Sequence, residues 1–237
     1  MKNIAVILAG GVGARVGGAV PKQLLPLADG RSVLEHSVEA FEHADCIDEV
    51  CVVMHPDYMA TVEEMIAKNG WQKVKHVISG GKERWESSVN AIRLYRERLL
   101  DRELAEANIL LHDAARPFVS SKIISDVCSA LVEHEAVVVA VPSTDTVYEM
   151  QDGCVARIPN RSTIMRAQTP QAFRLLLISE AYNEELGIRN EELEWGNGVK
   201  VTATDDCGIV HKNLPNTAIH IVFGEEQNKK ITFKEDI

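Results

Sequence analysis

Short apolar runs rich in β-branched residues alternate with segments of helical spacing over the first 141 of the 237 residues. A continuously apolar run is typical of a strand that is buried on both faces of a sheet. The alternation therefore predicts an α/β fold in which helices cover both faces of a doubly wound, mostly parallel sheet. The expected strands of this sheet span residues 4–8, 50–54, 74–78, 109–111 and 136–141.

The segments between these strands repeat their apolar residues with the period of a helix. Val33, Leu34, Val38 and Phe41 share one face after the N-cap candidate Ser32. Because ligands of such folds bind at the carboxyl ends of the strands, functional residues are expected in the loops that follow them. The other expected helices span 59–68, 89–100 and 123–132.

The strand–helix rhythm breaks after Pro142. Two short strands, at 144–150 and 154–158, are expected to pair around a QDG turn. The next segment, IPNRSTIMRAQTPQAF, is too polar for a core strand and carries two prolines, so it is interpreted as irregular. Residues 142–169 are therefore expected to leave the sheet as an excursion. The elements expected after it are a helix at 175–186 and a strand at 218–223.

The chain is acidic, with 25 lysines and arginines against 35 aspartates and glutamates, for a net charge of −10 with neutral histidines. This balance disfavours a nucleic-acid binder or a protein of anionic membranes, whose binding surface is basic. No apolar stretch approaches the ~20 residues of a membrane span. The five cysteines are scattered without a CxxC pair, so we expect buried, reduced thiols in a cytoplasmic protein.

A glycine-rich loop, LAGGVGARVGG, follows the first expected strand and leads into Pro21, Lys22 and Gln23. Glycine lets backbone N–H groups turn inward and approach an anion closely. The loop lacks the GxxxxGK[ST] string of a Walker A motif. The GxGxxG fingerprint of dinucleotide binding is incomplete, because Val16 stands at its third glycine position. Two cations, Arg15 and Lys22, accompany the N–H donors, and this combination suits a triphosphate.

Two further strings lie at strand ends. HDAARP follows the fourth expected strand and brings Asp113 and Arg116 to the ligand-binding edge, while His112 is expected to be buried and hydrogen-bonded. GGKERWESS follows the third expected strand, where its two glycines make the turn. Ser87 would then face a ligand from the first turn of the next helix.

Taken in order, these strings resemble the CTP-dependent cytidylyltransferases that act on polyol phosphates, a family with a methylerythritol-phosphate and a ribitol-phosphate branch. The resemblance implies a Rossmann-like sheet of the nucleotide-diphospho-sugar transferase type, in one domain over 1–237. It also implies a protruding β-arm, 142–169, that forms a homodimer, and Mg²⁺-dependent transfer of CMP from CTP. Besides the three strings, the resemblance rests on Asp145-Thr146, Arg161, QTPQAF, Thr204-Asp205 and NKKIT.

The resemblance assigns roles to residues at matching positions. Arg15, Lys22 and Lys230 match the catalytic cations that stabilise the reacting phosphates. The Mg²⁺ cofactor would be held mainly by the CTP phosphates, with no protein ligand assigned. The matching CTP-binding positions are Leu8, Ala9, Gly10, Gly11, Gly13, Gly80, Lys82, Ser87 and Asp113. The positions matching the polyol-phosphate site are Asp113, Arg116, Thr146, Arg161 and Thr169.

The identity of the polyol stays open at this point. The strings IPNR, TDDC and LAGG resemble the ribitol-phosphate branch and tilt the expectation slightly toward a pentitol phosphate. The alternatives are a transferase that makes another nucleoside-diphosphate sugar and a silent nucleotide-binding homologue. Arg15, Lys22, Asp113 and Lys230 together disfavour the silent homologue, and HDAARP together with QTPQAF disfavours the other transferases.

Overall fold

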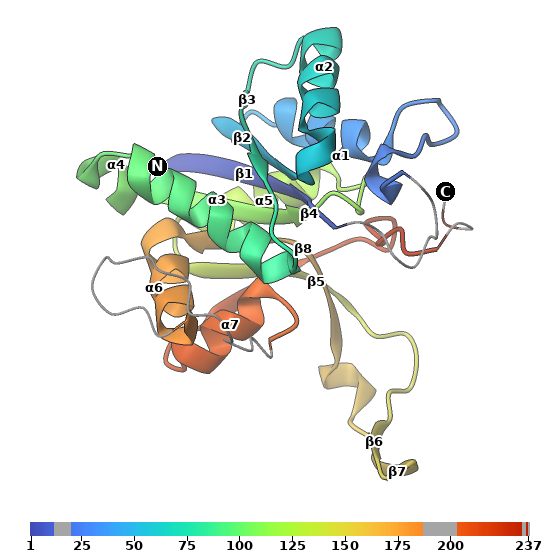
Figure 1. Ribbon diagram of the computed structural model, residues 1–237. Coiled ribbons are helices and arrows are strands. Elements are labelled where there is room, and N and C mark those ends of the chain that lie inside the picture. The colour runs from blue at the N-terminus through green and yellow to red at the C-terminus, as the bar shows by residue number, and fades with distance from the viewer. Residues whose placement is uncertain (12–19, 187–202, 234–235, 237) are drawn as a thin grey trace.

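The computed structural model describes residues 1–11, 20–186, 203–233 and 236. Its centre is a seven-stranded sheet with the strand order β3-β2-β1-β4-β8-β5-β9, flanked by helices (Figure 1). The predicted α/β class and mostly parallel sheet are confirmed, and every strand expected in the sheet is present. The strands are β1 Lys2–Ala9, β2 Glu49–Met54, β3 Val74–Ser79, β4 Ala107–Asp113, β5 Ala136–Pro142, β8 Met165–Arg174 and β9 Ile219–Phe223.

Alternate residues of β1 face two separate core layers, as the two-residue period of a strand requires. Ala5 and Ile7 pack on the side of α1, α2 and α5. Ile4 and Val6 pack on the side of α3, α6 and α7. Figure 1 shows α1 and α2 on one side of the sheet and α6 and α7 on the other. The helices are α1 Val33–Glu42, α2 Met59–Asn69, α3 Arg84–Arg98, α5 Ser121–Ala130, α6 Leu175–Leu186 and α7 Asp206–Asn213.

The helices α1, α5 and α7 each begin after a residue whose side chain caps the helix, namely Ser32, Ser120 and Asp205. Ser32 caps α1 as expected, because its side chain accepts from the Glu35 N–H while the Glu35 carboxylate accepts from the Ser32 N–H. Helix α3 begins at Arg84, well before the expected residue 89, so Ser87 lies in its first turn. The short α4, Asp101–Ala105, and α7 were not predicted, since each offers too few residues for a clear helical period. Short 3-10 helices span Lys22–Leu24, Pro56–Tyr58 and Arg161–Thr163.

The expectation that the segment before α6 is irregular is wrong for its second half. Residues Met165–Arg174 form β8, which runs antiparallel between β4 and β5 in the middle of the sheet. Its side chains Gln168, Thr169 and Gln171 are buried and hydrogen-bonded; Gln171, for example, donates to Asp205 and accepts from the Cys207 N–H. Pro170 lies where the β5–β8 register shifts, a place where a missing N–H interrupts no regular ladder.

The expected hairpin is present as β6, Glu149–Gln151, and β7, Cys154–Arg157, which form a two-stranded sheet of their own. Figure 1 shows this hairpin at the tip of an arm that extends away from the main sheet. Because Met165 already pairs with Pro142, the arm leaves the sheet over 143–164, a shorter stretch than the expected 142–169. Tyr148, Met150 and Val155 are exposed apolar residues on this arm.

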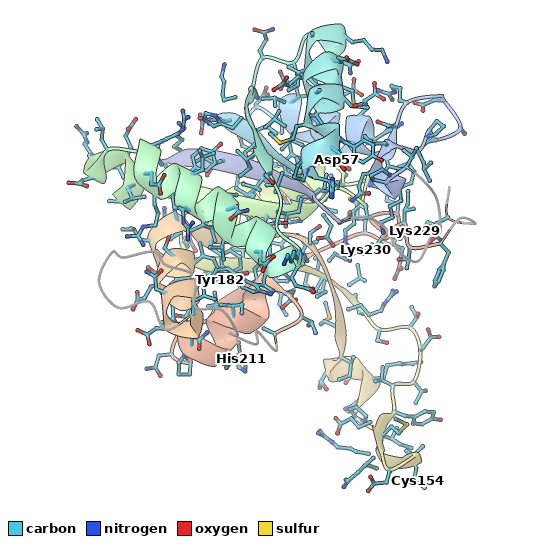
Figure 2. The ribbon with its side chains drawn as sticks, viewed as in Figure 1. Asp57, Cys154, Tyr182, His211, Lys229 and Lys230 are labelled. Atoms are coloured by element: carbon cyan, nitrogen blue, oxygen red, sulfur yellow. The ribbon has the colours of Figure 1, made fainter. Side chains whose placement is uncertain are left out.

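The five cysteines are free thiols, as expected. Cys51, Cys128 and Cys207 are buried, but Cys154 is exposed and lies at the tip of the arm (Figure 2). Within the described parts of the chain, no helix combines the length and the apolar character needed to cross a membrane.

Candidate active site

The carboxyl end of β1 is fixed by a buried glutamine. The Gln23 side-chain amide donates to the carbonyl oxygens of Ala9, at 2.9 Å, and Gly11, at 2.7 Å. Gln23 is only 4% exposed, so these bonds form in an environment where water does not compete. The described end of the glycine loop is therefore held in one conformation against the 3-10 helix that carries Lys22.

Gly10, Gly80 and Ser87 come together at the carboxyl ends of β1 and β3. A Cβ atom on Gly80 would lie 3.0 Å from Gly10 Cα and 3.0 Å from Ser87 Oγ. A Cβ atom on Gly10 would be almost as crowded, at 3.1 Å from Ser87 Oγ. Glycine is required at both positions because two backbones approach each other here. Three residues assigned to CTP binding, which come from two separate strings of the sequence, thus form one backbone-lined cradle, which we call the glycine cradle.

The turn after β3 is closed by Ser87 and Glu86. The Gly81 N–H donates to Ser87 Oγ at 3.1 Å, and the Lys82 N–H donates to the Glu86 carboxylate. A Cβ atom on Gly81 would lie 2.1 Å from Glu86 Cβ, which excludes any side chain there. Lys82 itself is exposed on this turn, beside the glycine cradle.

Asp113, the last residue of β4, accepts from two cations. Arg84 Nε lies 3.0 Å from its Oδ1, and Lys230 Nζ lies 2.7 Å from its Oδ2. Burial alone would raise the pKa of Asp113, but the charges of Arg84 and Lys230 outweigh it and hold the pKa well below its usual value. Asp113 is therefore a carboxylate at neutral pH, and it fixes the position of the Lys230 amine.

The Arg84 guanidinium bridges Asp113 to a second buried carboxylate. Its Nη1 lies 2.7 Å from Asp206 Oδ2, and the Tyr182 hydroxyl donates to Asp206 Oδ1 at 2.7 Å. Burial opposes the charge on Arg84, but Asp206 and Asp113 raise its pKa above the ordinary value. A continuous chain of charged and polar contacts thus runs from Lys230 to Tyr182, and Figure 2 labels both ends of it.

His112 and Thr169 fasten the loop that follows β4. The Asp113 N–H donates to Thr169 Oγ1 at 3.1 Å, so the threonine hydroxyl proton is left to donate to His112 Nδ1, also at 3.1 Å. The ring proton is then on Nε2, which donates to the Arg116 carbonyl at 3.1 Å. Burial lowers the pKa of His112 to about 4, so the ring is neutral. His112 is the buried, hydrogen-bonded histidine that the sequence predicts.

The segment 228–232 lies along this edge and carries Lys230. The Ile231 N–H donates to the Ala115 carbonyl at 2.8 Å, and Lys22 Nζ donates to the Ile231 carbonyl at 2.8 Å. The fully buried Asn228 side chain donates to Gln168 and to the Thr169 carbonyl. The hydrogen bond between Lys22 and Ile231 joins residues more than two hundred positions apart in the chain. It therefore brings two of the predicted catalytic cations, Lys22 and Lys230, to the same edge of the sheet.

Arg116 closes the same edge from the HDAARP loop. Its Nη1 donates to the Asn228 carbonyl at 2.8 Å, and its Nη2 lies 3.4 Å from the Ala167 carbonyl. Its Nε is buried without a hydrogen-bond partner among the described residues. Burial lowers the pKa of Arg116, because Asp113 does not fully compensate the lost hydration. A cation with unused donor capacity in this position is suited to an anionic ligand.

Two of the predicted site residues, Gly13 and Arg15, fall outside the described residues, and two others lie away from this edge. Thr146 and Arg161 are exposed on the arm, where Arg161 Nη1 donates to the Thr144 carbonyl at 3.1 Å. Figure 2 shows the arm, with Cys154 at its tip, extending away from the part of the chain that carries Lys230, so one chain does not bring all of the predicted polyol-phosphate residues together.

Several residues that build the site were not predicted. Gln23 stands in the PKQ string and Arg84 in the GGKERWESS string, but neither was assigned a role. The sequence offered one signal for Arg84, because this residue is a cation at the start of a helix that follows a strand. Asp206 and Asn228 gave no such signal, because their partners come from distant parts of the chain.

The edge offers few ligands for a metal ion. No group of three or more His, Cys, Asp or Glu side chains within metal-binding reach occurs among the described residues. Both oxygens of Asp113 already accept from cations. A divalent ion here would rely on the oxygens of a bound ligand, which is how Mg²⁺ commonly binds with phosphates.

Comparisons with known proteins match this architecture along the whole chain. A family model described as 2-C-methyl-D-erythritol 4-phosphate cytidylyltransferase matches residues 3–237. A relative of that name from Thermobifida fusca is 43% identical, over 98% of this chain and 89% of the relative. A bifunctional ribulose 5-phosphate reductase/CDP-ribitol pyrophosphorylase from Haemophilus influenzae is 35% identical, over 100% of this chain and 47% of the relative.

A solved structure is similar over the same length. The 4-diphosphocytidyl-2C-methyl-D-erythritol synthase of Anaerococcus prevotii superposes with a TM-score of 0.80 at 27% identity. The match covers 99% of this chain and 92% of that structure. The similarity therefore includes the sheet, the helices on both of its faces and the elements that carry the candidate site.

Proposed function

The chain belongs to the 2-C-methyl-D-erythritol 4-phosphate cytidylyltransferase family, and from this premise we propose that it transfers CMP from CTP to 2-C-methyl-D-erythritol 4-phosphate. Its relatives are named cytidylyltransferases of a methylerythritol phosphate or a ribitol phosphate, so the chain is a nucleotidyltransferase. The acceptor, the metal, the released pyrophosphate and the residue roles that follow are parts of the proposal.

The reaction requires no protein nucleophile. The acceptor phosphate has a second pKa of about 6, so it is mostly a dianion at neutral pH. One of its oxygens attacks the α-phosphorus of CTP in line. A new P–O bond forms while the bond to the bridging oxygen breaks, and the electron pair leaves with pyrophosphate. The barrier is mainly electrostatic, because two anions approach each other and charge grows on the leaving group.

The glycine cradle would hold the nucleotide. Gly10 and Gly80 leave room beside Ser87, and the backbone groups around them would read the cytosine and the ribose. A slot lined by backbone donors and acceptors discriminates strongly among bases, because a wrong base leaves buried polar groups unpaired. We therefore assign the cradle, together with Ala9 and Lys82, to CTP.

Lys22 and Lys230 would neutralise the reacting phosphates, with Arg15 as a third cation. Arg116 would bind the acceptor phosphate through its guanidinium group. Thr169 would act through Asp113, because its hydroxyl already bonds to the Asp113 N–H and to His112. The observation that carries the proposal is the convergence of Lys22 and Lys230 on one edge, beside the glycine cradle.

Mg²⁺ would be the cofactor, and it would spread the charge of the triphosphate. Its ligands would be phosphate oxygens and water. Removing divalent ions with a chelator should abolish turnover, and adding back Mg²⁺ should restore it.

We propose a homodimer that completes the site. Thr146 and Arg161 match polyol-phosphate positions, yet they lie on an arm that extends away from the part of its own chain that carries Lys230 (Figure 2). A second copy that exchanges arms about a two-fold axis would bring them to the edge. The exposed apolar residues of the arm support the same arrangement, because an isolated hairpin is marginally stable in water.

Methylerythritol phosphate is preferred as acceptor because the relative with 43% identity, matched over 89% of its length, carries that name. Ribitol 5-phosphate is the second candidate. It is supported by the IPNR, TDDC and LAGG strings and by the relative from Haemophilus influenzae.

A pyrophosphate-release assay tests the proposal. CTP is combined in turn with 2-C-methyl-D-erythritol 4-phosphate, ribitol 5-phosphate and glycerol 3-phosphate, and UTP and ATP replace CTP in parallel reactions. We expect release that requires CTP and is fastest with methylerythritol phosphate. Faster release with ribitol phosphate would favour the second candidate. No release with any acceptor, or equal turnover of UTP, would contradict CMP transfer.

A further inference from the structure

Arg84 is a charged residue of the candidate site that contacts two carboxylates, yet the proposed function gives it no role. It lies at the start of α3 and donates to Asp113, at the end of β4, and to Asp206, at the start of α7. We propose that Arg84 is a positioning residue for CMP transfer: it fixes the Asp113 carboxylate, and Asp113 in turn holds the Lys230 amine at the catalytic edge. The kinetic part of this inference rests on the proposed function.

The division of the two Asp113 oxygens carries the inference. Arg84 Nε occupies Oδ1 at 3.0 Å, and Lys230 Nζ occupies Oδ2 at 2.7 Å. With one oxygen fixed by Arg84, the carboxylate cannot turn without breaking a charge-assisted hydrogen bond. The Lys230 side chain is 43% exposed and has a long, flexible stem. Its amine is therefore located mainly by its carboxylate acceptor.

Arg84 is itself held from behind. Asp206 is fully buried, and its two oxygens accept from Arg84 Nη1 and from the Tyr182 hydroxyl, each at 2.7 Å. A guanidinium has five N–H donors in a rigid fork, so it can bridge two carboxylates that come from different elements. A lysine keeps the charge but is a single point donor. Arg84→Lys therefore removes the bridge while it leaves the network with the same net charge.

The charges of the network show why the lysine variant is the informative one. Arg84 and Lys230 balance Asp113 and Asp206, so the four groups are neutral together. A neutral replacement of Arg84 would leave Asp206 charged and buried without a cation, which is a large penalty to folding. A milder second variant, Tyr182→Phe, keeps the ring and removes only the hydroxyl that steadies Asp206.

The kinetic test compares Arg84→Lys with Arg96→Lys, a matched control in the last turn of the same helix, where Arg96 is exposed. We expect Arg84→Lys to lower kcat about tenfold, the effect of losing one charge-assisted hydrogen bond, with the KM for CTP unchanged. Tyr182→Phe should lower kcat in the same direction by less, and the control should match the wild type.

A double variant shows whether Arg84 acts through Lys230. If it does, Arg84→Lys with Lys230→Met should have the same kcat as Lys230→Met alone, because the position of a missing amine no longer matters. If the two losses multiply, Arg84 acts by another route and the inference is wrong.

A chemical readout decides the question without turnover. An amine-specific reagent is applied at limiting concentration to the wild type and to each variant, and the labelling of Lys230 is measured by mass spectrometry against that of the exposed Lys75. An amine that is released from its hydrogen bond to Asp113 Oδ2 is more accessible to the reagent, so Lys230 labelling should rise several-fold in Arg84→Lys. It should not change in Arg96→Lys.

Unchanged labelling of Lys230 in Arg84→Lys overturns the inference, even if CMP transfer is found. Increased labelling without CMP transfer in the wild type supports the positioning geometry and contradicts the proposed function instead.

Discussion

The backbone N–H of Asp113 donates to the hydroxyl oxygen of Thr169 at 3.1 Å, which joins the end of β4 to the antiparallel strand beside it. The Thr169 hydroxyl in turn donates a hydrogen bond to Nδ1 of the buried His112 ring, and that ring donates through Nε2 to the Arg116 carbonyl. Thr169, a polar residue in the centre of the sheet, is therefore part of the site, because its hydroxyl holds the loop that carries Asp113 and Arg116.

The buried ring of His112 predicts a dependence of stability on pH. Burial lowers its pKa to about 4 from an ordinary 6.5, so the unfolded chain binds a proton at a pH where the folded chain does not. Stability from the neutral ring is present above pH 6.5 and is lost as the pH falls toward 4. Between pH 7 and pH 5 the loss should be about 2 kcal/mol.

Urea unfolding of the wild type and of His112→Asn at these two pH values measures this contribution. The variant should lose less stability between pH 7 and pH 5, because it has no ring to protonate. Both values lie above the ordinary pKa of Glu35 and of Asp113, the pKa of each of which is lowered in the folded protein. Burial also lowers the pKa of His76 from its ordinary 6.5, but His76 is present in both proteins and contributes equally to both. An equal loss in both proteins would show that His112 is not the group responsible.

Lys22→Ala should lower kcat about a hundredfold, because a cation that stabilises developing charge is worth roughly 3 kcal/mol in the transition state. The KM for CTP should change much less. Lys75→Ala is the control, since Lys75 is exposed on β3. Steady-state pyrophosphate release measures both constants. If Lys22→Ala kept more than about half of the wild-type kcat, Lys22 would not be catalytic.

Gly80→Ala should weaken CTP binding. The added Cβ would lie 3.0 Å from Gly10 Cα and from Ser87 Oγ, so the backbones of the glycine cradle would have to separate. Titration calorimetry with CTP is expected to show an affinity lower by about tenfold or more. If the alanine variant bound CTP as tightly as the wild type, the glycine cradle would not be part of the nucleotide site.

Mixing two inactive variants tests the shared site. Lys22→Ala removes a residue of the catalytic edge, and Arg161→Ala removes a residue of the arm. After subunit exchange, half of the dimers are mixed, and each has one site with both residues intact. About a quarter of the wild-type activity should return if the arms are exchanged about a two-fold axis. If no activity returned although subunit exchange was verified, each active site would take Lys22 and Arg161 from the same chain, and the shared site would be wrong.

Much of the fold follows from local patterns in the sequence. The strands β1, β2 and β5 contain continuous apolar runs, and α1 has a capping pair, Ser32 and Glu35, that marks its start. These features depend on neighbours in the chain. The glycine cradle could also be anticipated, because Gly10 and Gly80 each stand directly after a strand of a parallel sheet and Ser87 lies in the first turn of the next helix.

The strand β8 could not be recognised in this way. A strand buried between two others is normally apolar, and Gln168, Thr169 and Gln171 break that pattern. Their hydrogen-bond partners are 34 or more residues distant in the chain. The role of Arg84 is hidden for the same reason, since Asp206 is 122 residues away. Contacts of this kind are set by the tertiary structure alone.

The fate of the α-phosphorus tests the central claim of CMP transfer most directly. CTP labelled at that atom is mixed with 2-C-methyl-D-erythritol 4-phosphate and an excess of the protein, so that a single turnover is observed. Direct attack by the acceptor predicts that all of the transferred label enters the diphosphate of a CDP-polyol, with none in pyrophosphate and none on the protein. Label released as free CMP, or retained covalently on the protein, would contradict the account.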